Sequence, residues 1–246
     1  MRHYLLQSPA GGSLTRNGRL RFLVILAETA ALVLLLSGPR AACAEGAAGV
    51  VTAARRLQDL AARIETRYRS LPPFKVAFTE RYTSTTFGSR DEARGTLHVV
   101  PPSRMLWIYD RPEGQRGALD GTVYWLIDPV DRQVTVRERP AGLADPLADL
   151  LAGRIELGKA FMVQEARGRA PAGRVLLELV PREPREDMDR AVLEADEADG
   201  TLRRLGIVDP LGNRFEYELG SPVPAAAPPA DAFKLVVPQG YAETRE

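Results

Sequence analysis

The sequence predicts a mainly β protein of the α+β class, whose strands form a meandering antiparallel sheet that can curl. From residue 74 onward, apolar and polar side chains alternate in short runs, which is typical of strands with one buried face. Tight-turn pairs such as Asp120-Gly121 and Asp199-Gly200 separate these runs, and strands joined by such short turns pair antiparallel. Only residues 50–71 have a long helical period.

The first element after the N-terminal region is this amphipathic helix. Its apolar residues recur at steps of four and three and therefore share one face, which consists of Val50, Ala54, Leu57, Ala61, Ile64, Tyr68 and Leu71. Pro72-Pro73 ends the helix. We expect the apolar face to pack on the rest of the protein.

The elements that follow are mostly short strands. Strands are predicted over residues 74–79, 95–100, 104–110, 117–119, 123–127, 133–137, 160–165, 175–180, 191–195, 202–208, 214–219 and 233–237. A short helix over residues 146–152 interrupts this order. Asp145 can cap that helix, Pro146 suits its first turn and Gly153 suits its end.

Residues 1–44 have the features of a secretory signal peptide. Arginines precede an apolar run over residues 22–36, and the small-residue sequence Ala42-Cys43-Ala44 follows a helix breaker. Glu28 interrupts the run, so its unbroken part is far shorter than the roughly 20 residues that span a bilayer. We therefore expect cleavage after Ala44 and a single domain over residues 45–246. Lipidation of Cys43 is an alternative that Arg40 disfavours.

Charge and composition exclude several classes of function. Without residues 1–44, 28 basic residues face 31 acidic ones, and the resulting net charge of about −3 gives no basis for binding nucleic acid. Beyond the leader the chain has no cysteine and one histidine, His98, which excludes a thiolate nucleophile and a multi-ligand zinc site. Acid pairs such as Asp187 with Asp189 are typical of a solvated surface. We expect no enzyme activity, no metal and no cofactor.

The inward side chains have two interpretations. They form an ordinary core with the two helices, or they line a pocket closed by the helices that accepts an apolar ligand. Periodicity does not choose between these alternatives. The candidate wall residues are Phe74, Val76, Phe78, Leu97, Val99, Met105, Trp107, Tyr109, Trp125, Phe161 and Phe215, with Val134, Val136, Tyr217 and Phe233 as further inward candidates. The candidate lid residues are Leu57, Ala61, Ile64, Tyr68, Leu147, Leu150 and Leu151.

Residues 95–112 resemble the strand pair of the LolA family of periplasmic lipoprotein carriers. That family reads approximately G-x-L-x-V-x-R-P-x-x-F-x-W-x-x-x-x-P, and this chain matches it at Gly95, Leu97, Val99, Pro102, Trp107 and Pro112. Further similarities follow in order along residues 50–241. They are Asp120-Gly121 before a Trp-containing strand, the helix near residues 146–151, Asp209-x-x-Gly212-Asn213, and Pro238-x-Gly240.

The resemblance implies a strongly curved, incomplete antiparallel half-barrel, covered by the N-terminal helix and the short internal helix. Its apolar cavity would take the acyl chains of a lipoprotein. The implied protein is a non-enzymatic periplasmic carrier, expected to be a monomer, that moves lipoproteins from the inner to the outer membrane. Its implied partners are an ABC-type release complex in the inner membrane and a lipoprotein receptor at the outer membrane. The alternative is a sensor or adaptor of the same superfamily that binds a lipoprotein or membrane partner without shuttling.

Two positions depart from the family pattern. The family arginine that is said to hold the lid shut is Pro101 here, so closure must depend on another contact. Arg104 is the candidate for that lid contact. The family phenylalanine before the tryptophan is Met105, whose flexible side chain still suits an adaptable apolar wall.

Overall fold

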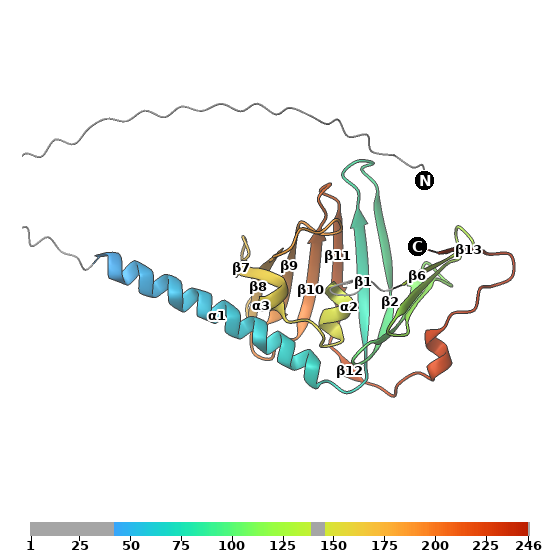
Figure 1. Cartoon of the computed structure of the whole chain (residues 1–246), viewed down its shortest axis with the longest axis horizontal. Helices are drawn as coiled ribbons and strands as arrows, with labels where there is room; N and C mark the ends of the chain where they lie inside the picture. The colour runs from blue at the N-terminus through green and yellow to red at the C-terminus, as the bar shows by residue number, and fades with distance from the viewer. Residues whose placement is uncertain (1–41, 139–145, 246) are drawn as a thin grey trace, which may run out of the picture. The chain divides into compact units, whose positions relative to one another are not determined.

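The structure, a computed structural model, describes residues 42–138 and 146–245 (Figure 1). The predicted leader over residues 1–44 lies almost entirely outside the described residues. Within the described part, no helix has the length and apolar character needed to span a bilayer.

The strands of the described residues form one sheet. They are β1 (Phe74–Thr83), β2 (Arg90–Val100), β3 (Arg104–Arg111), β4 (Arg116–Leu119), β5 (Val123–Asp128), β6 (Gln133–Glu138), β7 (Phe161–Glu165), β8 (Arg174–Pro181), β9 (Arg190–Asp196), β10 (Leu202–Val208), β11 (Arg214–Leu219), β12 (Val223–Pro224) and β13 (Ala242–Arg245). Their order is β13-β6-β5-β4-β3-β2-β1-β11-β10-β9-β8-β7, and β12 pairs with β1. All pairs are antiparallel except β13 with β6, which is parallel.

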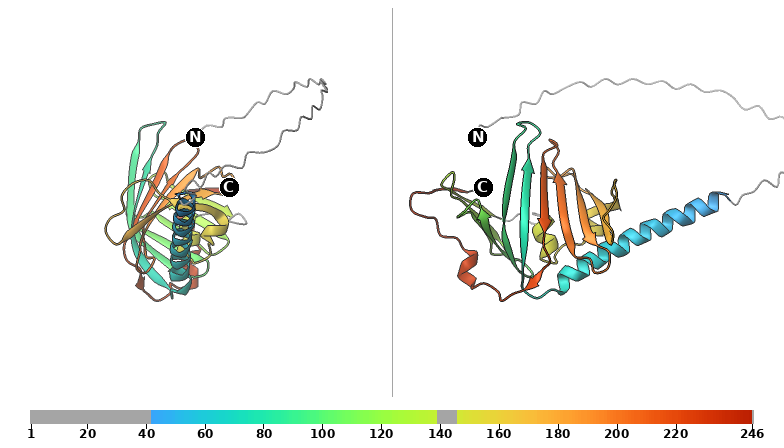
Figure 2. Two further views of the ribbon diagram at one scale, coloured as in Figure 1. Left: turned by 90° about the vertical axis from the view of Figure 1, so that its left-hand side faces the viewer. Right: turned by 180° about the vertical axis from the view of Figure 1, so that it is seen from behind.

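The sheet consists of two meanders that meet at its centre. Strands β1 to β6 form one meander and β7 to β11 form the other, and the pairing of β1 with β11 joins them. The sheet curves without closing, because its edge strands β13 and β7 are not paired with each other (Figure 2). The predicted fold class, a mainly β half-barrel with few helices, is therefore confirmed.

Helices cover the concave side of this sheet. They are α1 (Ala42–Ser70), α2 (Pro146–Leu151) and α3 (Leu157–Ala160), and a 3-10 turn η1 (Ala230–Phe233) follows β12. Helix α1 begins at Ala42 rather than at residue 50, and α3 has no counterpart in the sequence prediction. Apolar side chains of α1, α2 and the inward sheet face belong to one buried cluster.

The C-terminal segment packs on the opposite, convex side. Phe233 is fully buried there with Val100, Leu106 and Ala118. The strand predicted over residues 233–237 is wrong, because η1 and irregular chain occupy this stretch and β13 forms later. The outward side chains of β2 to β4 are apolar at this place and need a cover, which the tail supplies.

Polar contacts hold α1 to the second meander and to α3. The backbone amide of Leu202 donates a hydrogen bond of 3.0 Å to the hydroxyl oxygen of Tyr68. The amide of Leu157 donates one of 2.7 Å to Oε1 of Glu65. Arg63 donates to the backbone carbonyl of Glu197, whose carboxylate also pairs with Arg56 at 2.7 Å.

Two glycines allow α1 to approach the turns beneath it. A Cβ atom on Gly153 would lie 2.7 Å from Cα of Arg69, and one on Gly200 would lie 3.0 Å from Cα of Ile64. Both glycines also have positive φ angles, of 69° and 74°, which residues with a Cβ atom rarely adopt. The close packing of α1 on these turns therefore depends on glycine at positions 153 and 200.

We predict that Tyr68→Phe destabilises the fold by about 1–3 kcal/mol, because the buried amide of Leu202 loses its acceptor. Urea unfolding followed by circular dichroism measures this change. Tyr241→Phe is the control, and its effect should stay within about 0.5 kcal/mol. Equal stability of Tyr68→Phe and the wild type would show that the hydroxyl does not anchor α1.

The same hydroxyl predicts a pH effect. Burial is the main reason why the pKa of Tyr68 rises from 10.0 to about 12. The stability that this raised pKa contributes is present below pH 10.0 and is lost as the pH rises toward about 12. The stability difference between wild type and Tyr68→Phe should therefore shrink over this interval, as unfolding curves at several pH values would show. A constant difference would contradict a protonated, buried Tyr68.

Candidate ligand-binding face

The concave face of β1 to β3 is apolar over most of its area. Inward positions alternate along each strand, and register places Phe74 opposite Val99, and Val76 opposite Leu97. On β3 the inward residues are Met105, Trp107 and Tyr109, and Met105 lies opposite Val99. All of these side chains are buried, with at most 9% of their surface exposed. These side chains therefore point inward as expected, and their role as the wall of a ligand cavity stays a prediction.

Aromatic contacts extend the face toward neighbouring strands. Phe78 meets Tyr109 edge-on with ring centroids 5.2 Å apart. Trp107 meets Tyr124 of β5 edge-on at 5.8 Å. Such edge-to-face pairs are favourable beyond the area they bury. From the second meander, Phe161 is buried in the same cluster and Phe215 packs against it.

The predicted lid residues cover this face. Ala61, Ile64 and Tyr68 of α1 are buried in the cluster, and Leu57 packs against it. The residues that α2 contributes to the same cluster are Leu147, Leu150 and Leu151. The sheet face and both helices thus form one continuous apolar cluster. A ligand could reach the face only if the helices moved away from the sheet.

Trp125 lies on the other side of the sheet, so its prediction as a wall residue is wrong. Register pairs Trp125 with Ala118, which is buried in the convex-side cluster with Phe233. Its neighbour Tyr124 takes the inward place. Strand β5 has apolar residues on both faces, so alternation alone did not show which of them point inward. Val134, Val136 and Phe233, also predicted inward, belong to the convex-side clusters.

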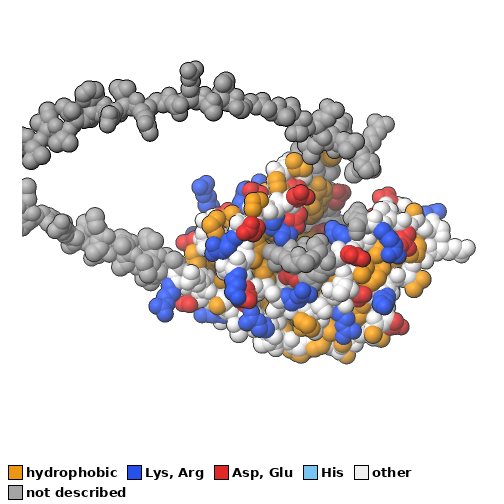
Figure 3. All heavy atoms as spheres, viewed as in Figure 1, with side chains coloured by type: hydrophobic (Ala, Val, Ile, Leu, Met, Phe, Trp, Pro, Cys, Tyr) orange, Lys and Arg blue, Asp and Glu red, His pale blue; other side chains and the backbone are white. Residues whose placement is uncertain are grey.

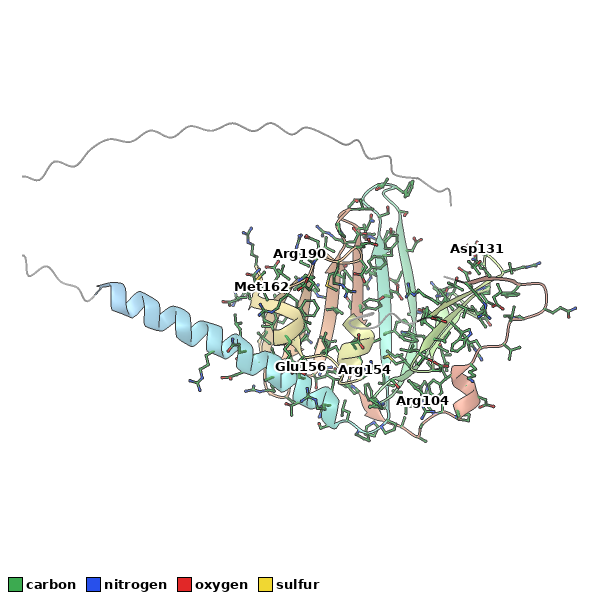
Figure 4. The ribbon with its side chains drawn as sticks, in the orientation of Figure 1. Arg104, Asp131, Arg154, Glu156, Met162 and Arg190 are labelled. Atoms are coloured by element: carbon green, nitrogen blue, oxygen red, sulfur yellow. The ribbon has the colours of Figure 1, made fainter. Side chains whose placement is uncertain are left out.

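Among the described residues, Arg104 packs on the convex side and not on the helical cover, which contradicts its prediction as a lid contact. Its guanidinium lies 5.0 Å from the centroid of the Phe233 ring, on the convex side beside η1 (Figure 4). Arg104 precedes the inward residue Met105 and therefore points outward. The contacts of Glu65, Tyr68 and Arg63 described above secure the cover instead.

A hollow of about 550 Å³ lies at the end of the concave face where β1 and β2 approach their hairpin. Glu80 and Tyr82 of β1 line one side, and Val130 and Asp131 of the β5–β6 turn line another. We call this hollow the mouth pocket. Exposed residues surround it, so it opens to solvent.

Glu80 is the first polar residue on the inward row of β1. The hydroxyls of Tyr109 and Tyr217 each donate a hydrogen bond of 3.5 Å to one of its carboxylate oxygens. Burial, and secondly the charge of Glu80, raise the pKa of Tyr109, which keeps this hydroxyl a donor. Sequence reasoning did not single out Glu80, although its position two residues after Phe78 gave the signal.

The outward-facing residues include His98 and a mixture of basic and acidic side chains. His98 lies opposite Lys75 on the outward side of β1 and β2, as predicted, and burial together with Lys75 lowers its pKa. Basic and acidic side chains are interspersed on the face seen in Figure 3. In residues 42–138 and 146–245, no three His, Cys, Asp or Glu side chains come together in a way that could hold a metal ion.

Comparison with known sequences identifies relatives. The family described as "Outer membrane lipoprotein carrier protein LolA" matches residues 69–236. An outer-membrane lipoprotein carrier protein of Chromobacterium violaceum is 28% identical over 159 residues, which cover 64% of this chain and 75% of the relative. Another from Methylibium petroleiphilum is 30% identical over 166 residues, covering 68% and 79%.

Comparison with solved structures gives more distant likenesses. A LolA superfamily protein from Nitrosomonas europaea has 12% sequence identity and a TM-score of 0.41, covering 73% of this chain and 97% of that chain. The complex of MucA and MucB from Pseudomonas aeruginosa gives 16% identity and a TM-score of 0.42, covering 73% and 61%.

The family match spans most of the chain, including both meanders and η1, whereas α1 before Arg69 lies outside it. Its members are binding proteins and not enzymes, so the prediction of a non-enzymatic protein is confirmed by the family. The order of motifs, the curved open sheet and the covered apolar face agree with this assignment. The chain belongs to the LolA family of outer-membrane lipoprotein carrier proteins.

Proposed function

We propose that this protein carries lipoproteins between membranes, with their acyl chains held against the concave apolar face. The observation that supports this best is that helices, and not a second sheet, bury that face. A cover that packs on the sheet by side chains, with hydrogen bonds such as those of Glu65 and Tyr68, can separate from it while the strand ladder stays intact. The names of the relatives support the same role.

The compartment and partners follow from this role. We place the protein in the periplasm, with residues 1–44 as a cleaved leader and residues 45–246 as one domain. An ABC-type complex in the inner membrane would deliver the cargo, and a receptor at the outer membrane would accept it. Each buried methylene contributes about 0.8 kcal/mol, so acyl chains do not cross water unescorted.

The wall of the site in this proposal consists of the inward residues of the covered face. They are Phe74, Val76, Phe78, Leu97, Val99, Met105, Trp107, Tyr109, Phe161 and Phe215, together with Tyr124. Leu57, Ala61, Ile64, Tyr68, Leu147, Leu150 and Leu151 act as the cover. In the closed state the cover occupies the apolar face, so the acyl chains replace these side chains when it opens.

The first test uses two tryptophans on opposite faces. Trp107→Glu should lower the affinity for an apolar fluorescent probe by more than about tenfold, because it places a carboxylate on the acyl-binding wall. Trp125→Glu makes the same change on the convex side and should leave affinity within about threefold. Fluorescence titration measures both, and circular dichroism checks the strands. Unchanged binding in folded Trp107→Glu would show that the wall is misassigned.

The second test loosens the cover. Only molecules with an open cover can bind, so the apparent affinity is proportional to the fraction of open molecules. Tyr68→Phe should increase this fraction and raise the affinity for an acylated lipopeptide several-fold, up to about tenfold. Tyr241→Phe should leave it unchanged. Isothermal titration measures the change. A fall in affinity would mean that Tyr68 belongs to the binding surface and not to the closing contacts.

Native mass spectrometry of protein isolated from its own periplasm separates a carrier from an adaptor. A retained diacyl species supports carriage. A stable complex with one membrane protein and no extractable lipid would overturn it in favour of an adaptor.

A further inference from the structure

Two turns that are far apart in the sequence project side by side from one end of the sheet (Figure 1). They are the β1–β2 turn over residues 84–89 and the β10–β11 turn over residues 209–213. Each turn has a large apolar side chain that the fold leaves exposed, Phe87 at 78% and Leu211 at 76%. We call these two side chains the apolar tips. A single exposed apolar residue is ordinary, whereas a pair on adjoining turns indicates a surface that meets another apolar phase.

Hydrogen bonds fix the two turns to each other. The amide of Thr85 donates a hydrogen bond of 3.0 Å to Oδ1 of Asn213, and its hydroxyl donates one of 3.0 Å to the carbonyl of Leu211. Asn213 is buried, and its Nδ2 donates to Oδ2 of Asp209 within the same turn at 2.8 Å. The backbone that presents the apolar tips is therefore ordered before any contact forms, so little conformational entropy is lost on binding.

The first outward row of side chains behind these turns is basic. Strand register aligns it across β9, β10, β11, β1 and β2, where its members are Arg190, Val208, Arg214, Thr83 and Arg90. We call its three arginines the arginine row. Arg190 pairs with Asp189 at 2.8 Å and approaches Glu178 at 3.8 Å. Among the described side chains, Arg214 and Arg90 form no ion pair. Since β1 lies between their strands, these two arginines are about 10 Å apart.

The excess of positive charge is confined to this row. In the next outward row, Glu216, Arg81 and Glu92 stand opposite one another, and Arg81 pairs with Glu92 at 2.9 Å. Asp91 of the mouth pocket stands opposite Tyr82 on the inward side, so it faces away from the arginine row. Beyond residue 44 the chain has more acidic than basic residues, so a row of arginines without an acid is a local departure. Its place directly behind the apolar tips gives both features one direction.

We infer that the apolar tips and the arginine row form a surface that contacts an anionic phospholipid bilayer. Phe87 and Leu211 enter the acyl layer, and Arg214 and Arg90 meet the lipid phosphates. A bilayer presents its groups in the same order, because its hydrocarbon lies beneath a layer of charged headgroups. The inference goes beyond the proposed carriage of cargo, and it can fail while the acyl-binding face stands.

A bilayer fits these tips better than a protein partner does. Stable protein interfaces bury about 800 Å² on each side around a packed apolar centre. Here two separate side chains project from turns, with a charged row behind them. A fluid bilayer receives such tips without a complementary shape. Two apolar side chains and a few charges also give weak, reversible attachment, which allows the protein to leave the membrane again.

Co-sedimentation with vesicles tests the apolar tips, using protein purified from its own periplasm. The vesicles contain equal parts of phosphatidylethanolamine and phosphatidylglycerol. Phe87→Ser combined with Leu211→Ser should lower the partition coefficient about tenfold or more, because both side chains lose their burial in hydrocarbon. Val223→Ser combined with Val236→Ser makes the matched change at two exposed positions outside the turns and should keep it within about twofold. Circular dichroism checks the folds.

The charges are tested on the same vesicles. Arg90→Gln combined with Arg214→Gln should weaken binding about tenfold or more, and binding to phosphatidylcholine vesicles should not change. Lys75→Gln combined with Arg55→Gln removes two exposed charges at the other end of β1 and on α1, and should have an effect of less than about threefold.

A fluorescent label tests insertion directly. Beyond residue 44 the chain has no cysteine, so a polarity-sensitive fluorophore on Phe87→Cys reports one position. Its emission should shift to the blue on the anionic vesicles, whereas the same label on Val236→Cys should not respond. Absence of wild-type binding, equal binding by the tip variant, or binding without this shift would overturn the inference. The tip variant should still bind the apolar probe as the wild type does, so loss of probe binding in the wild type would instead contradict the carrier function.

Discussion

The burial of the concave face under helices is the constraint on which the other features depend. A single curved sheet has no second sheet to cover its inner side chains, and exposed apolar surface of that size is unfavourable in water. Among the described side chains, the hydrogen bonds of α1 to other elements reach α3 and the β9–β10 region. Toward the first meander, α1 presents apolar and aromatic side chains of the concave cluster, as where the ring of Tyr68 lies 6.2 Å from that of Phe74.

The local sequence pattern was sufficient to predict which side chains point inward where one face of a strand meets the core and the other meets water. In β1 the alternation of Phe74, Val76 and Phe78 with polar residues fixed the inward side, and the structure agrees. The helical period predicted the cover residues of α1 for the same reason. The inward and outward residues of these elements could be assigned because only one side of each element is buried.

Local pattern failed where both sides of a strand are covered. Strand β5 is flanked by the concave cluster and by the C-terminal tail, so Tyr124 and Trp125 are both apolar contacts on opposite faces. Only the register with β4 decides which is inward. Arg104 was misassigned because its partner, Phe233, is far away in the sequence. The contacts of Tyr68 and Glu65 are equally distant, and no short motif marks them.

The polarity of β1 gives the site a direction. From Phe74 to Phe78 the inward row is apolar and buried, and from Glu80 to Tyr82 it is polar and partly exposed. An acyl chain is always joined to a polar head, so a cavity apolar throughout would bury that head without partners. A change of polarity along one strand avoids this cost and orients the ligand. In the proposed function, the acyl chains would lie toward Phe74 and the polypeptide would leave on the side of the mouth pocket.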